Sequence, residues 1–172
     1  GGVMARNVDM KAALRAYLAK LDIRNPAKVK GQFLPFGAFR SVPGRGRILL
    51  AGDAAGLVDP ITGEGIAHAM DSGALAAEAT AQALARGQPD SALPLYRTAL
   101  KPIHKSLRQA RMLRPLMFQP RLRPAFIRSF RTSRTLKDDY LRLLAGDTEY
   151  DLILRKLVTR LPSFAWRALR GI

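Results

Sequence analysis

The residues best suited to chemistry lie in one glycine-rich segment that holds two aspartates. The segment reads Gly52-Asp53-Ala54-Ala55-Gly56-Leu57-Val58-Asp59-Pro60-Ile61-Thr62-Gly63-Glu64-Gly65-Ile66. A fixed carboxylate can accept hydrogen bonds from neighbouring hydroxyl groups. Glycines let a backbone approach a ligand closely, and the N–H groups at the start of a helix favour negative charge. Together these groups suit a polyol attached to an electron-accepting ring.

Two elements must position this segment. Arg47 to Gly52 is apolar at both alternating sets of positions, which predicts a short buried strand in a parallel or mixed sheet. Gly65 to Arg86 is rich in small residues and is followed by Gly87-Gln88-Pro89, which predicts a long helix with a sharp end. This order would place Asp53 beyond the carboxyl edge of the sheet, where open α/β sheets bind ligands.

The same segment resembles the second flavin-binding motif of glutathione-reductase-type FAD enzymes. The version with Gly-Glu-Gly-Ile and a following Ser-Gly is most similar to the geranylgeranyl reductase family. Flavoproteins of that family hydrogenate carbon–carbon double bonds in polyprenyl chains. The resemblance is contiguous from Gly31 to Ala77, and a later Gly-Asp-x-x-Tyr element is also similar. The residues that carry it are Gly52–Gly56, Asp59-Pro60, Gly63–Ile66, Ala69–Gly73 and Gly146–Tyr150.

The resemblance implies that this segment binds FAD. Asp53 would accept hydrogen bonds from the ribityl chain, and Pro60 would pack along the isoalloxazine edge. The backbone N–H groups of Gly65 and Ile66 would face the N1 and O2 side of the ring. Reduced FAD would pass a hydride to an isoprenoid double bond, with NADPH or another donor reducing the flavin. No catalytic side chain is assigned, and the other expected cofactor contacts are Gly52, Ala54 and Gly63.

The sequence departs from the family because it lacks a Gly-x-Gly-x-x-Gly phosphate loop. The expected fold class is therefore α/β, as the C-terminal part of a glutathione-reductase-type FAD-binding fold followed by a mostly helical C-terminal region. Residues 1–41 would end a substrate domain, 42–90 would form the FAD-binding strand, loop and helix, and 91–172 a basic helical region. The opening Gly1-Gly2-Val3, without an initiator methionine, indicates a trimmed or partial sequence.

Several side chains near the motif have two interpretations. Asp59 would line the active site or form a turn before proline. Glu64 would tune the loop, although an acid that complements the helix dipole is the favoured interpretation. A catalytic role for His68 is the less favoured one, and His104 is expected at the surface. Residues expected in the core rather than in a lipid pocket are Met112, Met117, Phe118, Phe126, Phe130 and Trp166.

The remaining pattern is mostly helical. A helix with Asp9 as its N-cap is predicted to end at Asn25-Pro26. Val29 to Phe39 predicts an edge strand and loop. Pro102 is expected to kink or split the helix over 92–113. Prolines 115, 120 and 124 are expected to break the next stretch, and further helices are predicted over 136–144, 151–161 and 163–169.

The composition excludes several classes of site, and most of the excess positive charge lies in one segment. The 172 residues include 29 Lys+Arg and 13 Asp+Glu, a net charge of +16. Twelve basic residues lie from Arg97 to Lys137, and no acid lies between Asp90 and Asp138. Since the chain has no cysteine and two histidines, neither a disulfide framework nor a metal centre is expected. No stretch predicts a membrane span or a signal peptide.

The basic residues 97–137 predict an anionic partner. Isoprenoid substrates reside in membranes, so a helix lying on an anionic lipid surface would suit this segment. That predicts a cytoplasmic protein, peripheral to the inner face of the membrane. One alternative is another FAD enzyme of the same fold, such as an aromatic hydroxylase, a halogenase or a quinone-linked dehydrogenase. A second is a non-enzymatic basic helical module, although no nucleic-acid-binding motif appears and no nucleic-acid partner is expected.

Overall fold

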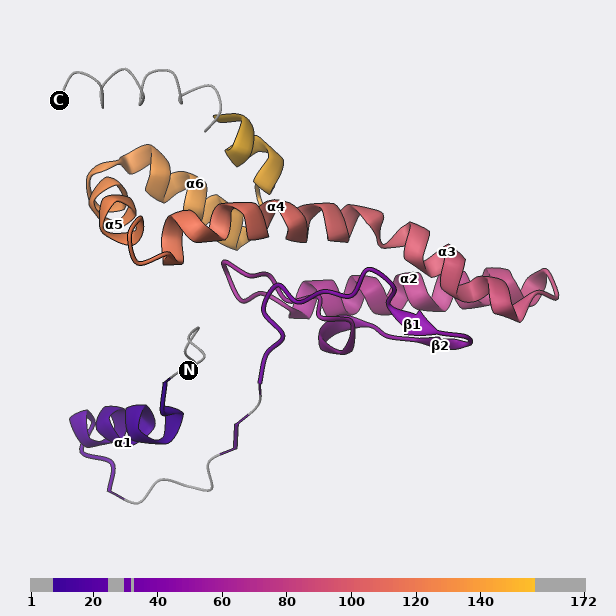
Figure 1. Ribbon diagram of the computed structural model, residues 1–172, viewed down its shortest axis with the longest axis horizontal. Coiled ribbons are helices and arrows are strands. Elements are labelled where there is room, and N and C mark those ends of the chain that lie inside the picture. Colours follow the sequence, from indigo (N-terminus) through magenta and orange to yellow (C-terminus); the bar gives the residue numbers. More distant parts are fainter. Residues whose placement is uncertain (1–7, 25–29, 32, 157–172) are drawn as a thin grey trace. The chain divides into compact units, whose positions relative to one another are not determined.

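The computed structural model describes residues 8–24, 30–31 and 33–156 (Figure 1). It divides into two compact units, Gly1–Phe33 and Leu34–Ile172. The first unit contains helix α1 (Met10–Lys20). Asp9 caps this helix as predicted, because its carboxylate accepts hydrogen bonds from the N–H groups of Lys11 and Ala12 at 2.9 and 3.0 Å. The helix ends at Lys20, before Asn25-Pro26, which lies outside the described residues.

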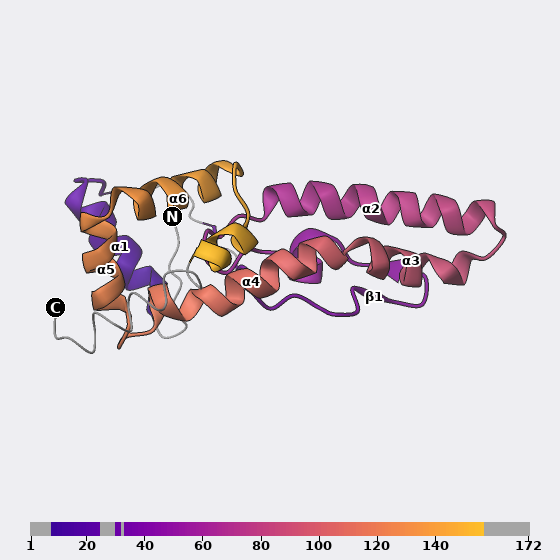
Figure 2. The ribbon, with the colours of Figure 1, turned by 90° about the horizontal axis from the view of Figure 1, so that it is seen from above.

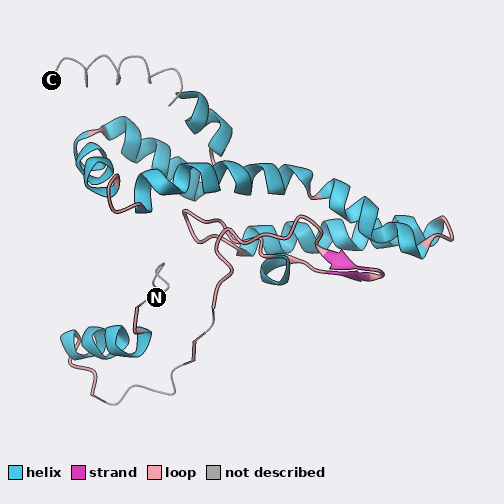
Figure 3. Cartoon of the chain, in the orientation of Figure 1, coloured by secondary structure: helices cyan, strands magenta, loops and turns pink. Residues whose placement is uncertain are grey.

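The second unit is mostly helical and has one small sheet among its described residues (Figure 3). Strands β1 (Gly44–Arg45) and β2 (Ile48–Leu49) form an antiparallel hairpin. The prediction of a buried parallel or mixed strand over Arg47–Gly52 is therefore wrong for this part of the chain. Ile48 is 68% exposed, because β2 pairs with a two-residue partner and no described sheet covers it.

The predicted edge strand over Val29–Phe39 is also wrong in the part that the structure describes. Its one ladder contact is an isolated parallel bridge between Phe36 and Val58. A strand is defined by its pairing partners, and a local sequence pattern does not reveal them. The segment after β2 instead forms a single 3₁₀ turn, η1 (Gly52–Ala55).

The long helix predicted after the glycine-rich segment is confirmed as α2 (Ile66–Ala85). Helix α2 lies beside α3 (Ala92–Ala99), as the two views in Figures 1 and 2 agree. A short 3₁₀ turn, η2 (Pro89–Ser91), joins the two. The buried side of α2 carries Ser72, Ala79 and Ala83. Such small side chains allow close packing between helices.

Helix α4 (Lys101–Phe118) follows α3 after a break at Leu100. This confirms the expected effect of Pro102, which occupies the first turn of α4, where its missing N–H costs no hydrogen bond. The expected break at Pro115 is wrong, because α4 continues to Phe118. Pro115 lies in the last turn of α4, so it removes one N–H donor, which would otherwise bond to the carbonyl oxygen of Arg111, and the helix ends three residues later.

Two shorter helices, α5 (Arg123–Thr132) and α6 (Arg134–Ala145), follow α4. Gly146 ends α6 with a φ of +77°, as expected for a helix C-cap. Helical structure resumes at Tyr150 and continues to Lys156, the last described residue. The rest of the predicted helix over 151–161, the helix over 163–169 and Trp166 lie outside the described residues. The structure thus has the mostly helical C-terminal region that the sequence predicts.

The described residues of the second unit contain two buried clusters. The first joins Leu57, which follows the η1 turn, to α2, α3 and α4; its fully or nearly fully buried members are Ala55, Leu57, Ala79, Tyr96, Leu100 and Leu107. The second joins Ile61 to α4 and to Tyr150; its buried members are Ile61, Ala110, Leu113 and Tyr150. The glycine-rich segment is therefore packed on the helical region along most of its length.

The structure corrects two predictions of burial. His104 is 5% exposed rather than at the surface, because it lies on the inner face of α4 with Leu107 and Ala110. Met112 is 71% exposed rather than in the core, because it lies on the opposite face of that helix. Met117, Phe118, Phe126 and Phe130 are half-buried.

Candidate functional site

Asp53 lies at the start of helix α2, although it belongs to the η1 turn. A Cβ atom added at Gly65, the N-cap residue of α2, would lie 3.4 Å from Asp53 Oδ1. Asp53 is exposed, and its carboxylate accepts no hydrogen bond from the described residues. A free carboxylate therefore stands beside a helix N-terminus.

The backbone N–H groups at this helix start are also available. Neither Gly65 nor Ile66 donates its N–H to any described residue. The next N–H, that of Ala67, donates to Glu64 Oε1 at 3.0 Å. Glu64 thus serves as an acid at the helix start, the interpretation that the sequence favoured. Two free donors and one free carboxylate remain together.

Gly52 is held against α2. Its N–H donates to Ser72 Oγ at 2.9 Å, and its φ is +52°. A Cβ atom at this position would lie 2.8 Å from the Cβ of Ala69. Ser72 belongs to the Ala69–Gly73 part of the resemblance, which implies no role for it. Its place in the helix repeat with the buried Ala79 and Ala83 is the sequence signal that indicates a polar group facing the core.

Asp59 is 4% exposed and organises the turn that follows it. Its Oδ1 atom accepts hydrogen bonds from the N–H groups of Ile61 and Thr62, both at 2.8 Å, and from Tyr150 Oη at 2.8 Å. Its own N–H donates to the carbonyl oxygen of Glu64 at 2.8 Å. This geometry supports the turn interpretation of Asp59.

Tyr150 is the last residue of the Gly-Asp-x-x-Tyr element, and the sequence does not reveal its partner. The hydroxyl reaches Asp59 across 91 positions of the chain. Burial, the nearby Asp59 charge and the hydrogen bond to it raise the pKa of Tyr150 far above its ordinary value. Tyr150 therefore stays protonated and continues to donate its hydrogen bond at any ordinary pH.

The other predicted site residues are distributed around this turn. Ala54 is exposed in the η1 turn. Gly63 has a φ of +75° and donates its N–H to the carbonyl oxygen of Asp59 at 3.0 Å. Pro60 is fully buried, and a Cβ atom at Gly37 would lie 2.9 Å from its ring. The contact expected between Pro60 and an isoalloxazine edge stays a prediction.

The ring of Phe39 contacts an aromatic and a cationic side chain of α4. His104 stacks on its ring with a centroid distance of 5.1 Å, and the Arg111 guanidinium lies 5.2 Å from the ring centroid. His104 Nε2 is buried and has no hydrogen-bond partner among the described residues. Burial, followed by the charges of Arg108 and Arg97, lowers the pKa of His104. His68 is half-buried in the first turn of α2.

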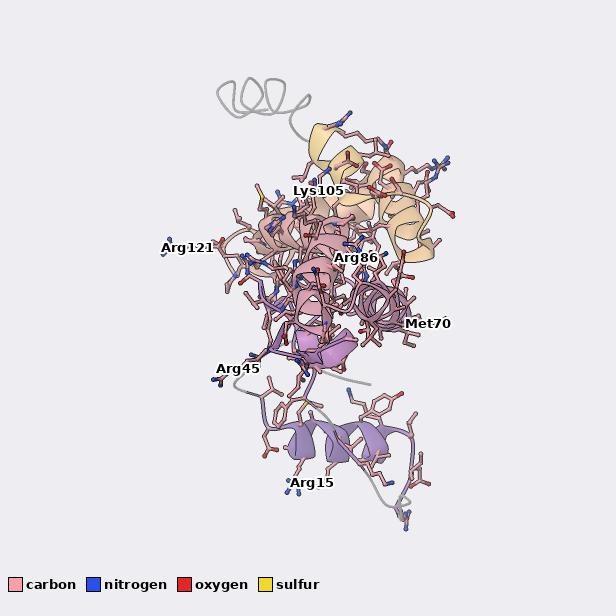
Figure 4. All side chains as sticks on the ribbon, turned by 90° about the vertical axis from the view of Figure 1, so that its right-hand side faces the viewer. Arg15, Arg45, Met70, Arg86, Lys105 and Arg121 are labelled. Carbon is pink, nitrogen blue, oxygen red and sulfur yellow. The ribbon has the colours of Figure 1, made fainter. Side chains whose placement is uncertain are left out.

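The basic residues from Arg97 to Lys137 carry uncompensated charge. None of them forms an ion pair with an Asp or Glu side chain in the part of the chain that the structure describes. Lys105 and Arg121 are labelled in Figure 4, where Arg121 extends away from the helices. One surface hollow on α5 is lined by Arg123, Pro124, Ile127, Arg128, Arg131 and Thr132. A second, on α4, is lined by Arg111, Arg114, Pro115, Phe118 and Gln119.

Arg47 makes the one long-range ion pair that involves the hairpin among the described residues. Its Nε lies 2.8 Å from Asp90 Oδ1, with both side chains largely exposed. Arg45 and Arg47 could contact a cofactor phosphate, although solvated side chains at the strand edge are the favoured interpretation of the sequence. Arg47 instead closes the hairpin against η2, and Arg45 is exposed (Figure 4).

Comparisons of the chain with family models, curated proteins and solved structures returned no match. Within the described residues, no three His, Asp or Glu side chains come together in a group that could hold a metal ion. None of the described helices combines the length and the apolar character that crossing a membrane requires.

Proposed function

We propose that this chain forms the flavin-facing part of an FAD-dependent oxidoreductase of the geranylgeranyl reductase type. The observation that carries the proposal is a free Asp53 carboxylate beside Gly65, where the N–H groups of Gly65 and Ile66 are also free of partners among the described residues. The sequence motif accounts for why these groups occur at this spacing. In this proposal, the segment from Gly52 to Ile66 holds the ribityl chain and the isoalloxazine ring.

The available groups have the chemistry that a flavin needs. The Asp53 carboxylate accepts hydrogen bonds from the ribityl hydroxyls. The Gly65 and Ile66 N–H groups and the start of α2 stabilise negative charge at N1 and O2. Each charge-assisted hydrogen bond of this kind contributes about 1.5–3 kcal/mol. The chemistry that FAD supplies when bound is hydride transfer to a carbon–carbon double bond.

The sequence supplies groups for the flavin half of FAD and none for its ADP half. No Gly-x-Gly-x-x-Gly loop is present, so the chain offers no phosphate loop for the ADP half of FAD. The 172 residues by themselves should therefore bind FAD weakly. The proposal concerns the native polypeptide that carries this sequence.

The proposed substrate is an isoprenoid lipid held at an anionic membrane surface. The basic residues of α4 and α5 lack carboxylate partners among the described residues, and exposed apolar side chains lie between them. Cations attract anionic head groups, and apolar side chains enter the boundary of the acyl chains. A cytoplasmic location, peripheral to the inner face of the membrane, belongs to the same proposal. The exposed apolar residues are Met112, Leu116, Leu122 and Ile127.

Turnover of the purified native polypeptide tests this function. We expect bound FAD and, with NADPH or dithionite as donor, hydrogenation of a geranylgeranyl lipid detected by mass spectrometry. Oxygenation or halogenation of an aromatic substrate, without hydrogenation of the lipid, would favour another FAD enzyme of the same fold. A polypeptide that binds no FAD would refute the proposal in all its forms.

A further inference from the structure

We propose that Tyr150 is a positioning residue that fixes the backbone of the segment Asp59–Ile66 from the C-terminal region. This deepens the proposed function, on which it rests for the identity of the cofactor. The geometric part of the inference rests on this chain alone.

One carboxylate oxygen accepts three hydrogen bonds at this turn. Asp59 Oδ1 receives the N–H groups of Ile61 and Thr62 together with the hydroxyl of Tyr150. Asp59 and Tyr150 are 4% and 3% exposed. A buried carboxylate is costly unless its lone pairs are satisfied, and each of these three donors contributes to that. Removing the Tyr150 hydroxyl therefore removes a charge-assisted bond in a place that water does not readily reach.

Tyr150 is the hydrogen-bond partner of this segment that lies far away along the chain. Within the described residues, the other hydrogen bonds of Asp59–Ile66 connect it to itself or to the first turn of α2. The hydroxyl of Tyr150 comes instead from beyond α6. Apolar packing joins the same two segments, since Ile61 lies in one buried cluster with Tyr150 and with Ala110 of α4.

A backbone hydrogen bond connects this turn to the peptide that precedes the free N–H groups of Gly65 and Ile66. The Asp59 N–H donates to the carbonyl oxygen of Glu64, the residue that precedes Gly65. A rotation of the Asp59 side chain or backbone would therefore move the peptide that leads into Gly65 and Ile66. In this way Tyr150 controls the direction of the donors that face the proposed flavin ring, although it does not touch them.

The first test measures amide hydrogen exchange on the full 172-residue chain without any cofactor. Tyr150→Phe keeps the aromatic ring in its cluster and removes the hydroxyl. We expect the amides of Ile61 and Thr62 to exchange about tenfold or more faster, with those of the α2 interior unchanged. Unchanged exchange at Ile61 and Thr62 would overturn the inference. Equal acceleration throughout α2 would also overturn it, since Tyr150 would then act only on global stability.

Tyr140→Phe is the matched control. Tyr140 packs against the same buried cluster, and its hydroxyl makes no hydrogen bond among the described residues. Its removal should leave the exchange of the segment unchanged. Asp59→Asn keeps an acceptor oxygen for all three donors and should retain most of the protection, whereas Asp59→Ala should lose it.

The second test uses the native polypeptide with FAD. Tyr150→Phe should shift the visible spectrum of the flavin and weaken FAD binding about fivefold or more, and Tyr140→Phe should do neither. A normal spectrum and affinity in Tyr150→Phe would overturn the positioning role toward the cofactor. Faster exchange at Ile61 and Thr62 in a polypeptide that binds no FAD would support the positioning of the segment and refute the proposed function.

Discussion

Polar side chains at the residue scale determine what this fold can do. Asp59 and Asp53 lie in the same glycine-rich segment, yet their environments differ. Asp59 is buried and accepts three hydrogen bonds, so it is committed to the backbone of the turn. Asp53 is exposed and accepts none from the described residues, so it remains available to a ligand. Asp59 thus has a structural role, and Asp53 is the carboxylate to which the proposed function assigns the contact with FAD.

His104 makes stability depend on pH. Its pKa is lowered in the folded chain, while that of an unfolded histidine is about 6.5. As pH falls below about 6.5, the unfolded chain therefore takes up a proton that folded His104 resists. The free energy of unfolding should fall by up to about 1.4 kcal/mol for each pH unit. Protonation would also add charge near Arg97 and Arg108.

Urea unfolding at about pH 5 and about pH 7 measures this dependence. His104→Leu should reduce the difference between the two values. His68→Leu leaves His104 in place and should keep the difference. If the wild-type chain and His104→Leu lost stability equally at acid pH, another group would have to be responsible.

At the scale of the elements, alanine substitutions at two glycines test how closely the chain packs against α2. Gly52 has a φ of +52°, and a Cβ there would lie 2.8 Å from Ala69 Cβ. Gly52→Ala should therefore lower the free energy of unfolding by about 2–4 kcal/mol. A Cβ at Gly73, inside α2, would meet nothing within 4 Å. Gly73→Ala should raise the free energy of unfolding by about 0.5–1 kcal/mol, because alanine stabilises a helix relative to glycine.

Denaturant titration of both variants checks this contrast. Similar stability for the two would show that Gly52 does not hold the chain against α2. Loss of stability in Gly73→Ala would show that α2 is packed more closely at that point than the contacts of Gly73 indicate.

The sequence predicts helices well and strands poorly. The long α2, the break before Pro102 and the end of α6 at Gly146 follow from local signals: small residues, a proline without an N–H and a glycine that tolerates a positive φ. The strand expected over Arg47–Gly52 does not follow, because pairing depends on residues elsewhere. The Asp59–Tyr150 bond could not be predicted either, since a single sequence does not show which residues 91 positions apart meet.

The candidate site divides in the same way. The order of Asp53, Gly65 and Ile66 predicts a carboxylate beside a helix start, and that proximity is observed. The burial of Pro60 and His104 could not be predicted, because it depends on the packing of distant segments. A basic or apolar residue type does not by itself indicate which face of α4 it occupies, as His104 and Met112 illustrate.

Charge governs behaviour at the scale of the whole molecule. The chain should bind vesicles that contain phosphatidylglycerol more tightly than neutral phosphatidylcholine vesicles, and added salt should weaken that binding. The combined change Arg123→Gln, Arg128→Gln and Arg131→Gln should weaken it about tenfold to hundredfold. These three arginines line one hollow on α5.

Vesicle sedimentation with a variant of equal charge provides the control. Arg15, Arg45 and Arg86 are exposed and lie outside residues 97–137 (Figure 4). Changing all three to glutamine should have a smaller effect than the α5 change. Equal binding to neutral and anionic vesicles would contradict the proposed lipid surface.

The most direct measurement of the central claim is the FAD content of the native polypeptide that carries this sequence. Asp53→Ala should reduce the affinity for FAD about tenfold or more, because it removes the free carboxylate beside the start of α2. Glu78→Ala, which removes an exposed carboxylate of α2 outside the segment that resembles the flavin-binding motif, should leave FAD content unchanged. Retention of FAD by Asp53→Ala at the wild-type level would contradict the account.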